Sequence, residues 1–345
     1  MTTRTRRILI GLLVPFALLA ACGDDGSSDD DSADATATTA APEEQPATEW
    51  PVDIEHAFGT TTIEEQPESV ASASVSMTGH LLAVDAPVVA SMATSPDSPI
   101  ADENGFFIQW SEEASDAGVQ AIPGPAINVE AIAAAQPDLI IGSAVGGDAV
   151  DEQTYELLSA IAPTIVIDHS GSTWQDITLL MGEATGHQQE ATDAISTFDD
   201  LVAETAEGVD TTFEASAFVY NPDGVNVFTA ESAHGQLLES LGYTVHEVPE
   251  DVVGDSNLEG SSQRQDVVAI SLENTGPAFG DSTLFFVLAD EEAMEGYIAG
   301  DSVLAAVPAV GEDRAFALGP ESFRLDYFSA TDVVETIAAL PTSGG

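Results

Sequence analysis

Hydrophobic runs that suit β-strands alternate with helical stretches from about residue 70 to the end of the chain. This alternation favours mostly parallel sheets flanked by helices on both faces, so the sequence predicts an α/β fold. The predicted strands are Ala71–Val75, Val88–Met92, Asp138–Ser143, Thr164–Asp168, Ser216–Asn221, Val225–Ala230, Tyr243–Val248, Thr283–Ala289 and Ala315–Gly319.

A longer helical stretch breaks this alternation in the middle of the chain. Trp174 to Thr185 and His187 to Glu207 both have helical patterns, and Gly186 separates them. The second helix carries one apolar stripe at i, i+4, i+7 and i+11, formed by Ala191, Ile195, Phe198 and Val202. A helix of about 20 residues is roughly 30 Å long, which is enough to connect two lobes.

A short internal repeat supports two lobes. Glu130 lies in the first turn of a predicted helix, and Asp138 follows eight residues later, directly before a strand. Glu273 and Asp281 repeat this spacing in the second half of the chain. An acid in the first turn of a helix is stabilised by the helix dipole.

The first 21 residues have the pattern of an export signal. Met1–Arg7 is basic, and Ile8–Ala20 is apolar but too short to span a membrane. The segment ends in Leu19-Ala20-Ala21-Cys22, which resembles a bacterial lipobox, so we expect the Cys22 thiol to carry a diacylglycerol. An ordinary signal peptide followed by an incidental cysteine is the alternative.

The residues after Cys22 predict a solvated tether, because they include no aromatic side chain up to residue 49 and cannot repay the entropy cost of ordering. We therefore expect an extracytoplasmic protein that is anchored to the cell membrane by lipid alone. The predicted parts are a signal peptide (1–21), an acidic tether (22–49), an N-terminal lobe (50–171), a connecting helical region (172–208) and a C-terminal lobe (209–341).

Acidic residues greatly outnumber basic ones. The chain has 60 Asp and Glu residues, 6 arginines and no lysine, for a net charge of −54. Such a surface repels polyanions, which argues against a nucleic-acid partner. The absence of lysine excludes a P-loop or Schiff-base lysine, and a single cysteine excludes internal disulfides.

The chain contains no G-x-S-x-G, H-E-x-x-H or G-x-G-x-x-G motif, and no two of its six histidines are three or four residues apart. No helix therefore presents a ready-made pair of metal ligands. We predict no catalytic residue, no metal site and no cofactor. Histidines from different loops could still converge, as in a zinc or manganese carrier, and this alternative stays open.

The arginines are informative because they are scarce. Only Arg264, Arg314 and Arg324 follow the signal segment, and Arg324 lies among aromatic residues in the run SFRLDYF. A guanidinium beside aromatic rings suits a planar, anionic, aromatic ligand, although each arginine could instead form an ordinary salt bridge. We favour a ligand-binding role for Arg324 and Arg264 over one for Arg314.

Several segments resemble ABC-transporter solute-binding proteins for ferric siderophores, and in particular their enterobactin-type branch. The resemblance extends from about residue 50 to about residue 340. This chain differs from the branch in having fewer basic residues, and it has none in the loop at 98–101. The segments are Phe106–Trp110, Gln136–Ile140, Ser143–Asp148, Leu158–Thr164, Glu231–Glu239, Arg264–Asp266 and Leu304–Ala330.

The resemblance implies two lobes joined by one long helix, with the ligand in the cleft between them. It implies that Arg264, Arg324 and Phe228 are cleft residues, with Trp110 and Tyr327 as further candidates. For the three aromatic residues, packing in the core is the alternative.

The resemblance also implies that one acid from each lobe docks on permease arginines. The matching positions are Glu130 and Glu273, whose alternative role is helix N-terminal electrostatics alone.

The sequence thus predicts a monomeric receptor that captures a ferric siderophore, specifically a catecholate, and hands it to an ABC importer without catalysing a reaction. The same fold carrying a hydroxamate siderophore, haem, cobalamin or a metal ion is the first alternative. A secreted hydrolase and a purely structural surface protein are more remote.

Overall fold

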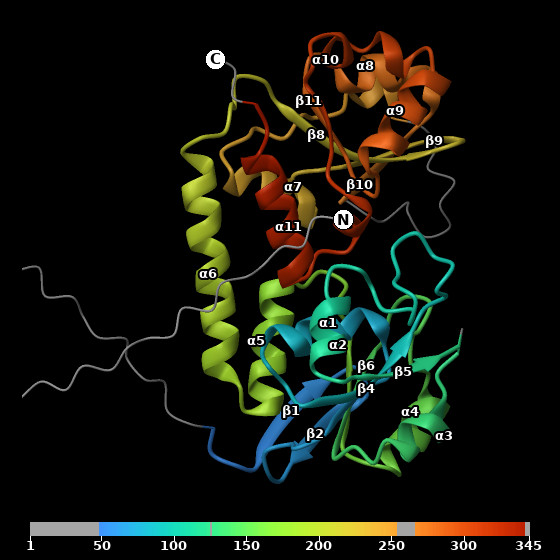
Figure 1. The fold of residues 1–345 in the computed structure, drawn as a ribbon, viewed down its shortest axis with the longest axis vertical. Coiled ribbons are helices and arrows are strands. Elements are labelled where there is room, and N and C mark those ends of the chain that lie inside the picture. The colour runs from blue at the N-terminus through green and yellow to red at the C-terminus, as the bar shows by residue number, and fades with distance from the viewer. Residues whose placement is uncertain (1–47, 125, 254–265, 342–345) are drawn as a thin grey trace, which may run out of the picture. The chain divides into compact units, whose positions relative to one another are not determined.

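The computed structural model describes residues 48–124, 126–253 and 266–341. Two five-stranded sheets lie in this part of the chain, and a two-stranded hairpin precedes them. Each large sheet is the centre of one lobe (Figure 1). Apolar side chains are buried on both faces of each sheet. The predicted class, an α/β fold with two lobes, is confirmed.

The N-terminal lobe is built on an entirely parallel sheet with the strand order β5-β4-β3-β6-β7. Every residue of β3, β6 and β7 is buried, because helices cover both faces of the sheet. The strands are β3 (Val70–Ser72), β4 (Val88–Ala93), β5 (Gln120–Pro123), β6 (Leu139–Ser143) and β7 (Thr164–Ile167). The helices are α1 (Val75–Ala83), α2 (Ser111–Asp116), α3 (Val129–Ala134) and α4 (Glu152–Ser159). The hairpin, β1 (Val52–His56) and β2 (Gly59–Ile63), lies beside β7.

The C-terminal lobe has a mixed sheet with the strand order β10-β9-β8-β11-β12. Strands β8, β11 and β12 are parallel, whereas β9 and β10 are antiparallel to their neighbours because a tight hairpin turn joins β8 to β9. The strands are β8 (Ala215–Asn221), β9 (Gly224–Phe228), β10 (Val267–Ile270), β11 (Thr283–Phe286) and β12 (Ala315–Ala317). The helices are α7 (Ala233–Ser240), α8 (Thr275–Phe279), α9 (Glu291–Gly300), α10 (Pro308–Gly311) and α11 (Tyr327–Ala338), and the short 3-10 helices are η1 (Glu250–Val252), η3 (Leu272–Asn274), η4 (Leu304–Ala306) and η5 (Pro320–Phe323).

A hairpin of two helices connects the lobes, whereas one long helix was expected to join them. Helix α5 (Trp174–Thr185) ends at Gly186, whose φ of 75° reverses the chain into α6 (Gln188–Ala206). Helix α5 packs against α1 of the N-terminal lobe, and α6 packs against both α5 and α11. Figure 1 shows α6 running alongside both lobes.

One predicted strand is wrong, and several were missed. The segment 243–248 forms only an isolated bridge between Val245 and Ala215. Strands β5 and β10 and the hairpin β1–β2 were not predicted, and the antiparallel strands make the second sheet less parallel than expected.

The predicted signal peptide, the lipidation site Cys22 and almost all of the tether lie outside the described residues. The lobe boundaries stay predictions. Within the described residues, no helix is both long enough and apolar enough to cross a bilayer.

Candidate ligand-binding cleft

A cavity of about 550 Å³ lies between the two lobes. Its N-terminal wall comes from the segments that follow β3, β4, β5 and β6, which places the cavity at the carboxyl edge of the parallel sheet. Ligands of open α/β sheets bind at this edge. The wall residues include Ser76, Thr94, Gly124 and Asp148.

Arg324 is the contribution of the C-terminal lobe to this cavity. It lies between η5 and α11, and its Nη1 atom donates a hydrogen bond over 2.9 Å to the Oγ of Ser76 at the start of α1. Its guanidinium carbon lies 5.7 Å from the centroid of the Phe107 ring. The side chain is exposed, and among the described residues it forms no ion pair. A guanidinium that has no carboxylate partner among the described residues therefore lies at the cleft.

The N-terminal wall has its own electrostatic features. Ser74, the N-cap residue of α1, makes no capping hydrogen bond with its side chain, and its Oγ donates to the Oδ2 of Asp148 over 2.6 Å. The positive end of the helix dipole thus lies in the same wall as this carboxylate. Burial, and then the charge of Arg324, lower the pKa of His169 nearby, while Asp148 and Asp168 oppose that shift. The pKa shift keeps His169 neutral at neutral pH.

The lobes touch beside the cleft, where α1 meets the first turn of α11. Asp326, the N-cap residue of α11, is 5% exposed and accepts a hydrogen bond from the Nε2 of Gln109 over 3.3 Å. A Cβ atom on Gly79 would lie 2.4 Å from the Oδ2 of Asp326 and 2.8 Å from the Cδ1 of Trp110. Burial raises the pKa of Asp326 to about 6, because hydrogen bonds from Ser329 and Gln109 only partly oppose the effect of burial.

Of the five predicted ligand-binding residues, only Arg324 is seen in the cleft wall. Arg264 lies outside the described residues. Trp110 is completely buried in the core of the N-terminal lobe, and Phe228 is 7% exposed and stacks on His234 at 4.1 Å. Tyr327 is half-buried and packs near Trp174 at the foot of α11, with ring centroids 6.1 Å apart.

The two predicted docking acids, Glu130 and Glu273, are both exposed and lie in the first turns of α3 and η3. The acids that follow them in the repeat have different partners. Asp138 accepts hydrogen bonds from the backbone N–H groups of Glu68 and Ser69, whereas Asp281 pairs with Arg314. The repeat therefore preserves an exposed acid in each lobe but not the environment of the acid that follows it.

Sequence reasoning missed Ser76 and Phe107 as cleft residues. Each lies in a segment that follows a parallel strand, but only the strand order brings these segments to one edge. The described residues contain no cluster of three or more His, Cys, Asp or Glu side chains that could hold a metal ion.

Two α/β lobes, a connecting helical hairpin and a cleft at the carboxyl edge of a parallel sheet define the class of this molecule as a two-lobed solute-binding protein. The sequence profile of the periplasmic binding protein family matches residues 70–265. The chain therefore belongs to the periplasmic binding protein family, whose members bind substrates and are not enzymes.

Two curated relatives support this assignment. The chain is 38% identical over 297 residues to the ferric enterobactin-binding periplasmic protein FepB of Escherichia coli O6:H1, covering 85% of this chain and 92% of FepB. It is 25% identical over 239 residues to the probable siderophore-binding lipoprotein YfiY of Bacillus subtilis, covering 68% of this chain and 66% of YfiY.

Solved structures agree. The crystal structure of holo-ViuP matches with a TM-score of 0.71 and 31% identity over 84% of this chain and 95% of ViuP. Staphylococcus aureus SirA complexed with staphyloferrin B matches with a TM-score of 0.62 over 82% of this chain and 96% of SirA. At 22% identity, the match to SirA supports the fold alone.

Proposed function

We propose that this protein is a lipid-anchored, extracytoplasmic receptor that captures a ferric siderophore and delivers it to an ABC importer. The proposed cargo is a catecholate complex of the enterobactin type. Relatedness to FepB, which is named for binding ferric enterobactin, supports the ligand class. The observation that carries the proposal is the guanidinium of Arg324 in the interlobe cleft, which has no carboxylate partner among the described residues.

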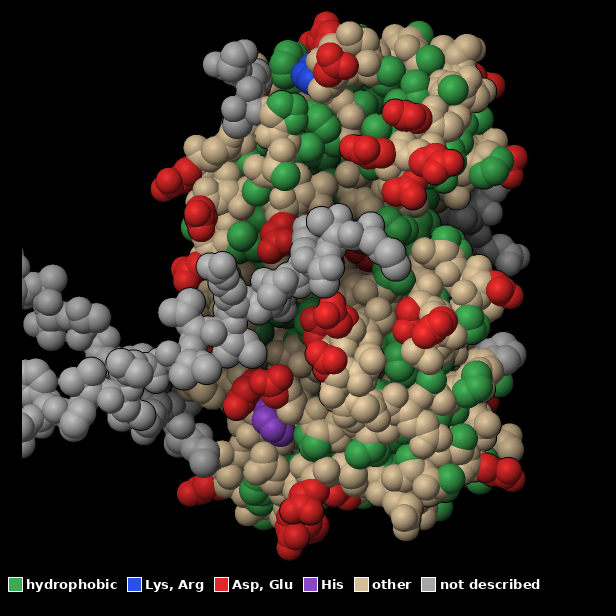
Figure 2. All heavy atoms as spheres, viewed as in Figure 1, with side chains coloured by type: hydrophobic (Ala, Val, Ile, Leu, Met, Phe, Trp, Pro, Cys, Tyr) green, Lys and Arg blue, Asp and Glu red, His purple; other side chains and the backbone are tan. Residues whose placement is uncertain are grey.

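The charge of the protein as a whole opposes this cargo, so the local arginine must overcome it. Figure 2 shows acidic side chains spread over both lobes of the visible face, with basic side chains confined to one small area. A ferric tris-catecholate carries a charge of about −3, and a guanidinium about 5 Å away contributes roughly 3 kcal/mol per unit of ligand charge before desolvation. A carboxylate about 20 Å away through water contributes about 0.2 kcal/mol of repulsion per unit of ligand charge, and salt reduces this repulsion about tenfold. A nearby arginine can therefore outweigh many distant carboxylates.

The other parts of the proposal follow from the predicted residues. Arg264 supplies a second cation to the cleft, and the lipid on Cys22 holds the receptor at the membrane. Glu130 and Glu273 dock on permease arginines. Both side chains are exposed, one in each lobe, and are therefore accessible to the permease. The proposed receptor is a monomer, and one chain supplies both walls of the cleft, so the site needs no second copy to be complete.

Fluorescence quenching of the purified full chain tests the cargo. The ligands are a ferric tris-catecholate, a ferric trihydroxamate, haem and cyanocobalamin, which differ in net charge and shape. We expect the tris-catecholate to bind tightest, and we expect Arg324→Gln to weaken it by at least about tenfold, or roughly 1.4 kcal/mol.

Arg314→Gln is the matched control, because it removes the same charge from the C-terminal lobe outside the cleft. Tighter binding of the trihydroxamate, with no effect of Arg324→Gln, would favour the alternative cargo. No quenching by any of the four ligands would contradict the proposal.

A further inference from the structure

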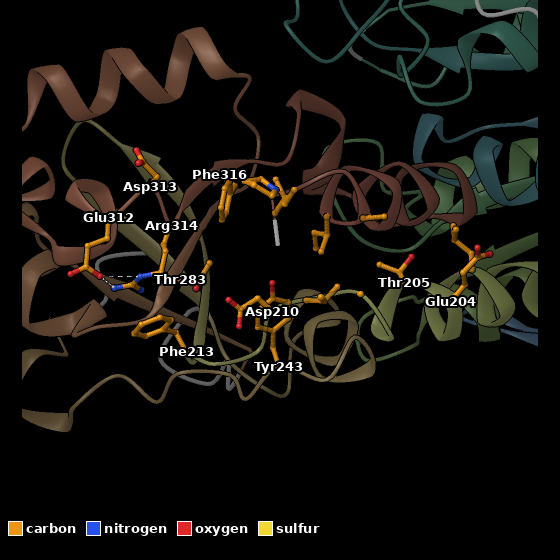
Figure 3. Close-up of a pocket in the computed structure, with 17 residues that line it drawn as sticks. Glu204, Thr205, Asp210, Phe213, Tyr243, Thr283, Glu312, Asp313, Arg314 and Phe316 are labelled. Carbon is orange, nitrogen blue, oxygen red and sulfur yellow. Dashed lines mark hydrogen bonds and ion pairs between the residues drawn. The ribbon is translucent and has the colours of Figure 1, made fainter. Parts of the chain in front are cut away.

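A second cavity, of about 650 Å³, lies between the connecting helix α6 and the C-terminal lobe. Its walls come from the C-terminal half of α6, the segment between α6 and β8, Tyr243 after α7, the last turn of α11, and residues on and around β11 and β12 (Figure 3). None of its lining residues belongs to the N-terminal lobe or to the interlobe cleft. This cavity is therefore separate from the site described above.

The cavity has aromatic walls. Phe213, Tyr243 and Phe316 line it, together with the apolar side chains of Leu201 and Ile337. Aromatic faces carry negative electrostatic potential, so they attract cations as well as apolar groups.

The one cationic residue among the lining residues is already neutralised. The Nη2 atom of Arg314 pairs with Asp281 at 2.6 Å and with Glu312 at 2.7 Å. Its guanidinium also lies 3.7 Å from the centroid of the Phe213 ring. Figure 3 shows the Arg314 head group turned toward Glu312. Arg314 is thus not available to attract an anion.

Carboxylates that pair with no cation of the described chain remain around the cavity. Glu204, Asp210 and Asp313 line it, and none of them forms an ion pair with a described residue. Hydrogen bonds from Thr212 lower the pKa of Asp210, so this carboxylate is ionised at neutral pH. The cavity therefore repels anions, including the cargo proposed for the cleft.

Tyr243 adds an independent polar feature. Its side chain lines the cavity and is only 7% exposed, and its hydroxyl forms no hydrogen bond with a described residue. Burial, and then the charge of Asp210, raise the pKa of Tyr243 to about 12, so the hydroxyl stays protonated and neutral. A hydroxyl that is accessible from the cavity and close to a carboxylate offers hydrogen bonds to a polar group inside the cavity.

We propose that this cavity binds an organic cation that has an apolar body, such as an alkylammonium or arylalkylammonium ion. The apolar body packs against the aromatic walls, and the ammonium group lies near Asp210 and Tyr243. Carboxylates and aromatic faces together favour such a cation through charge-assisted hydrogen bonds and cation–π contacts.

Calorimetric titration of the purified full chain tests the ligand class with three probes that share one skeleton. Phenethylammonium is the cation, phenethyl alcohol its neutral counterpart and phenylacetate an anionic one. We expect the cation to bind at least about tenfold tighter than the alcohol, or roughly 1.4 kcal/mol, and phenylacetate to show no binding. Added salt weakens binding of the cation, because part of the attraction is electrostatic. Equal affinity for the cation and the alcohol overturns the proposal.

Matched variants locate the site. Asp210→Asn removes the carboxylate charge, and we expect about a tenfold loss of affinity for phenethylammonium. Asp223→Asn, an equal charge change in the exposed β8–β9 turn, leaves affinity unchanged. Tyr243→Phe keeps the aromatic wall and tests the hydroxyl, and thermal melting checks that each variant is folded.

The cleft variant Arg324→Gln should leave binding of the probe unchanged. If this variant abolishes probe binding, or if Asp210→Asn and Tyr243→Phe both fold and bind as the parent chain does, the second site does not exist.

Discussion

The backbone of Gly79 in α1 lies directly against the carboxylate of Asp326, the N-cap residue of α11, so that the two lobes meet without any side chain at position 79. This contact lies beside the ligand cleft, because Arg324 lines the cleft two residues before Asp326. Any change in the distance between α1 and α11 will therefore change the width of the cleft.

Gly79→Ala should force these helices apart. The added Cβ would lie 2.4 Å from the Oδ2 of Asp326, and relief requires α11 or the Trp110 ring to move. We expect a loss of about 1–3 kcal/mol in the free energy of unfolding, as for other overpacked contacts, together with a more open solution structure. Urea unfolding and small-angle X-ray scattering measure the two effects.

Gly296→Ala is the matched control for this helix position. Gly296 is exposed on α9, and an added Cβ there meets no atom within 4 Å. The control should be neutral or slightly stabilising, because alanine favours helix over glycine by about 1 kcal/mol. Equal effects of the two substitutions would contradict a close contact at Gly79.

Asp326 should make stability depend on pH in an unusual direction. Burial raises its pKa from 3.8 to about 6, so the folded protein holds a proton that the unfolded chain releases between these values. Stability contributed by this group is therefore full below about pH 4 and falls as the pH rises to about 6, by at most about 3 kcal/mol.

Asp326→Asn should remove this loss. Asparagine is also a good N-cap residue and keeps an oxygen for the backbone N–H of Ser329. The variant should gain stability over the parent between pH 4 and pH 6 and keep that gain at higher pH. Buried His80 and His234, with pKa values lowered to about 3 and about 4, make stability rise with pH and so act in the opposite direction. The quantity to measure is therefore the difference between variant and parent in the free energy of urea unfolding. A pH-independent difference would mean that Asp326 is ionised throughout.

The sequence predicted the connecting helices more accurately than the strands. An apolar stripe and Gly186 define α5 and α6 locally, and the structure bounds them within a residue or two of the prediction. The segment at 243–248 has strand-like composition, but its backbone exchanges only a few hydrogen bonds with Ala215. Strand β5 has only four residues and ends in Pro123, so its hydrophobic pattern was too short to predict a strand.

The candidate site was predicted only where chemistry alone distinguished a residue. Arg324 was notable because cations are rare in this chain. Trp110 and Phe107 are both aromatic and both buried in the same core, yet only Phe107 also lines the cavity, and only the packing of the folded lobes separates them. Ser76 could be identified as a cleft residue only once the strand order and the interlobe contact were known.

Docking on a permease should depend on Glu130 and Glu273 together. We expect Glu130→Gln with Glu273→Gln to reduce ligand-stimulated ATPase activity of the importer by at least about tenfold in proteoliposomes, while the ligand Kd stays the same. Loss of a few tenths of a kcal/mol in stability is also expected, because both acids lie in first helical turns.

The control for this pair is Glu152→Gln with Glu291→Gln. These acids are also exposed in first helical turns, one in each lobe, so the control removes the same charge and the same helix-dipole interaction. Equal ATPase loss in both double variants would show that net charge, and not the two predicted docking positions, governs the interaction with the importer.

Salt should accelerate ligand capture. A net charge of −54 repels an anionic ferric complex at long range, whereas the attraction of Arg324 acts only at short range inside the cleft. At about 0.5 M salt the repulsion between distant charges is largely screened, so we expect the association rate constant to rise several-fold from its value at about 0.03 M.

Stopped-flow fluorescence with a ferric tris-catecholate measures the rate, and a neutral ferric trihydroxamate provides the control, whose rate should hardly change. A rate that falls with salt for the tris-catecholate would mean that the field at the cleft is positive overall, and the distant carboxylates would then play no part in controlling capture.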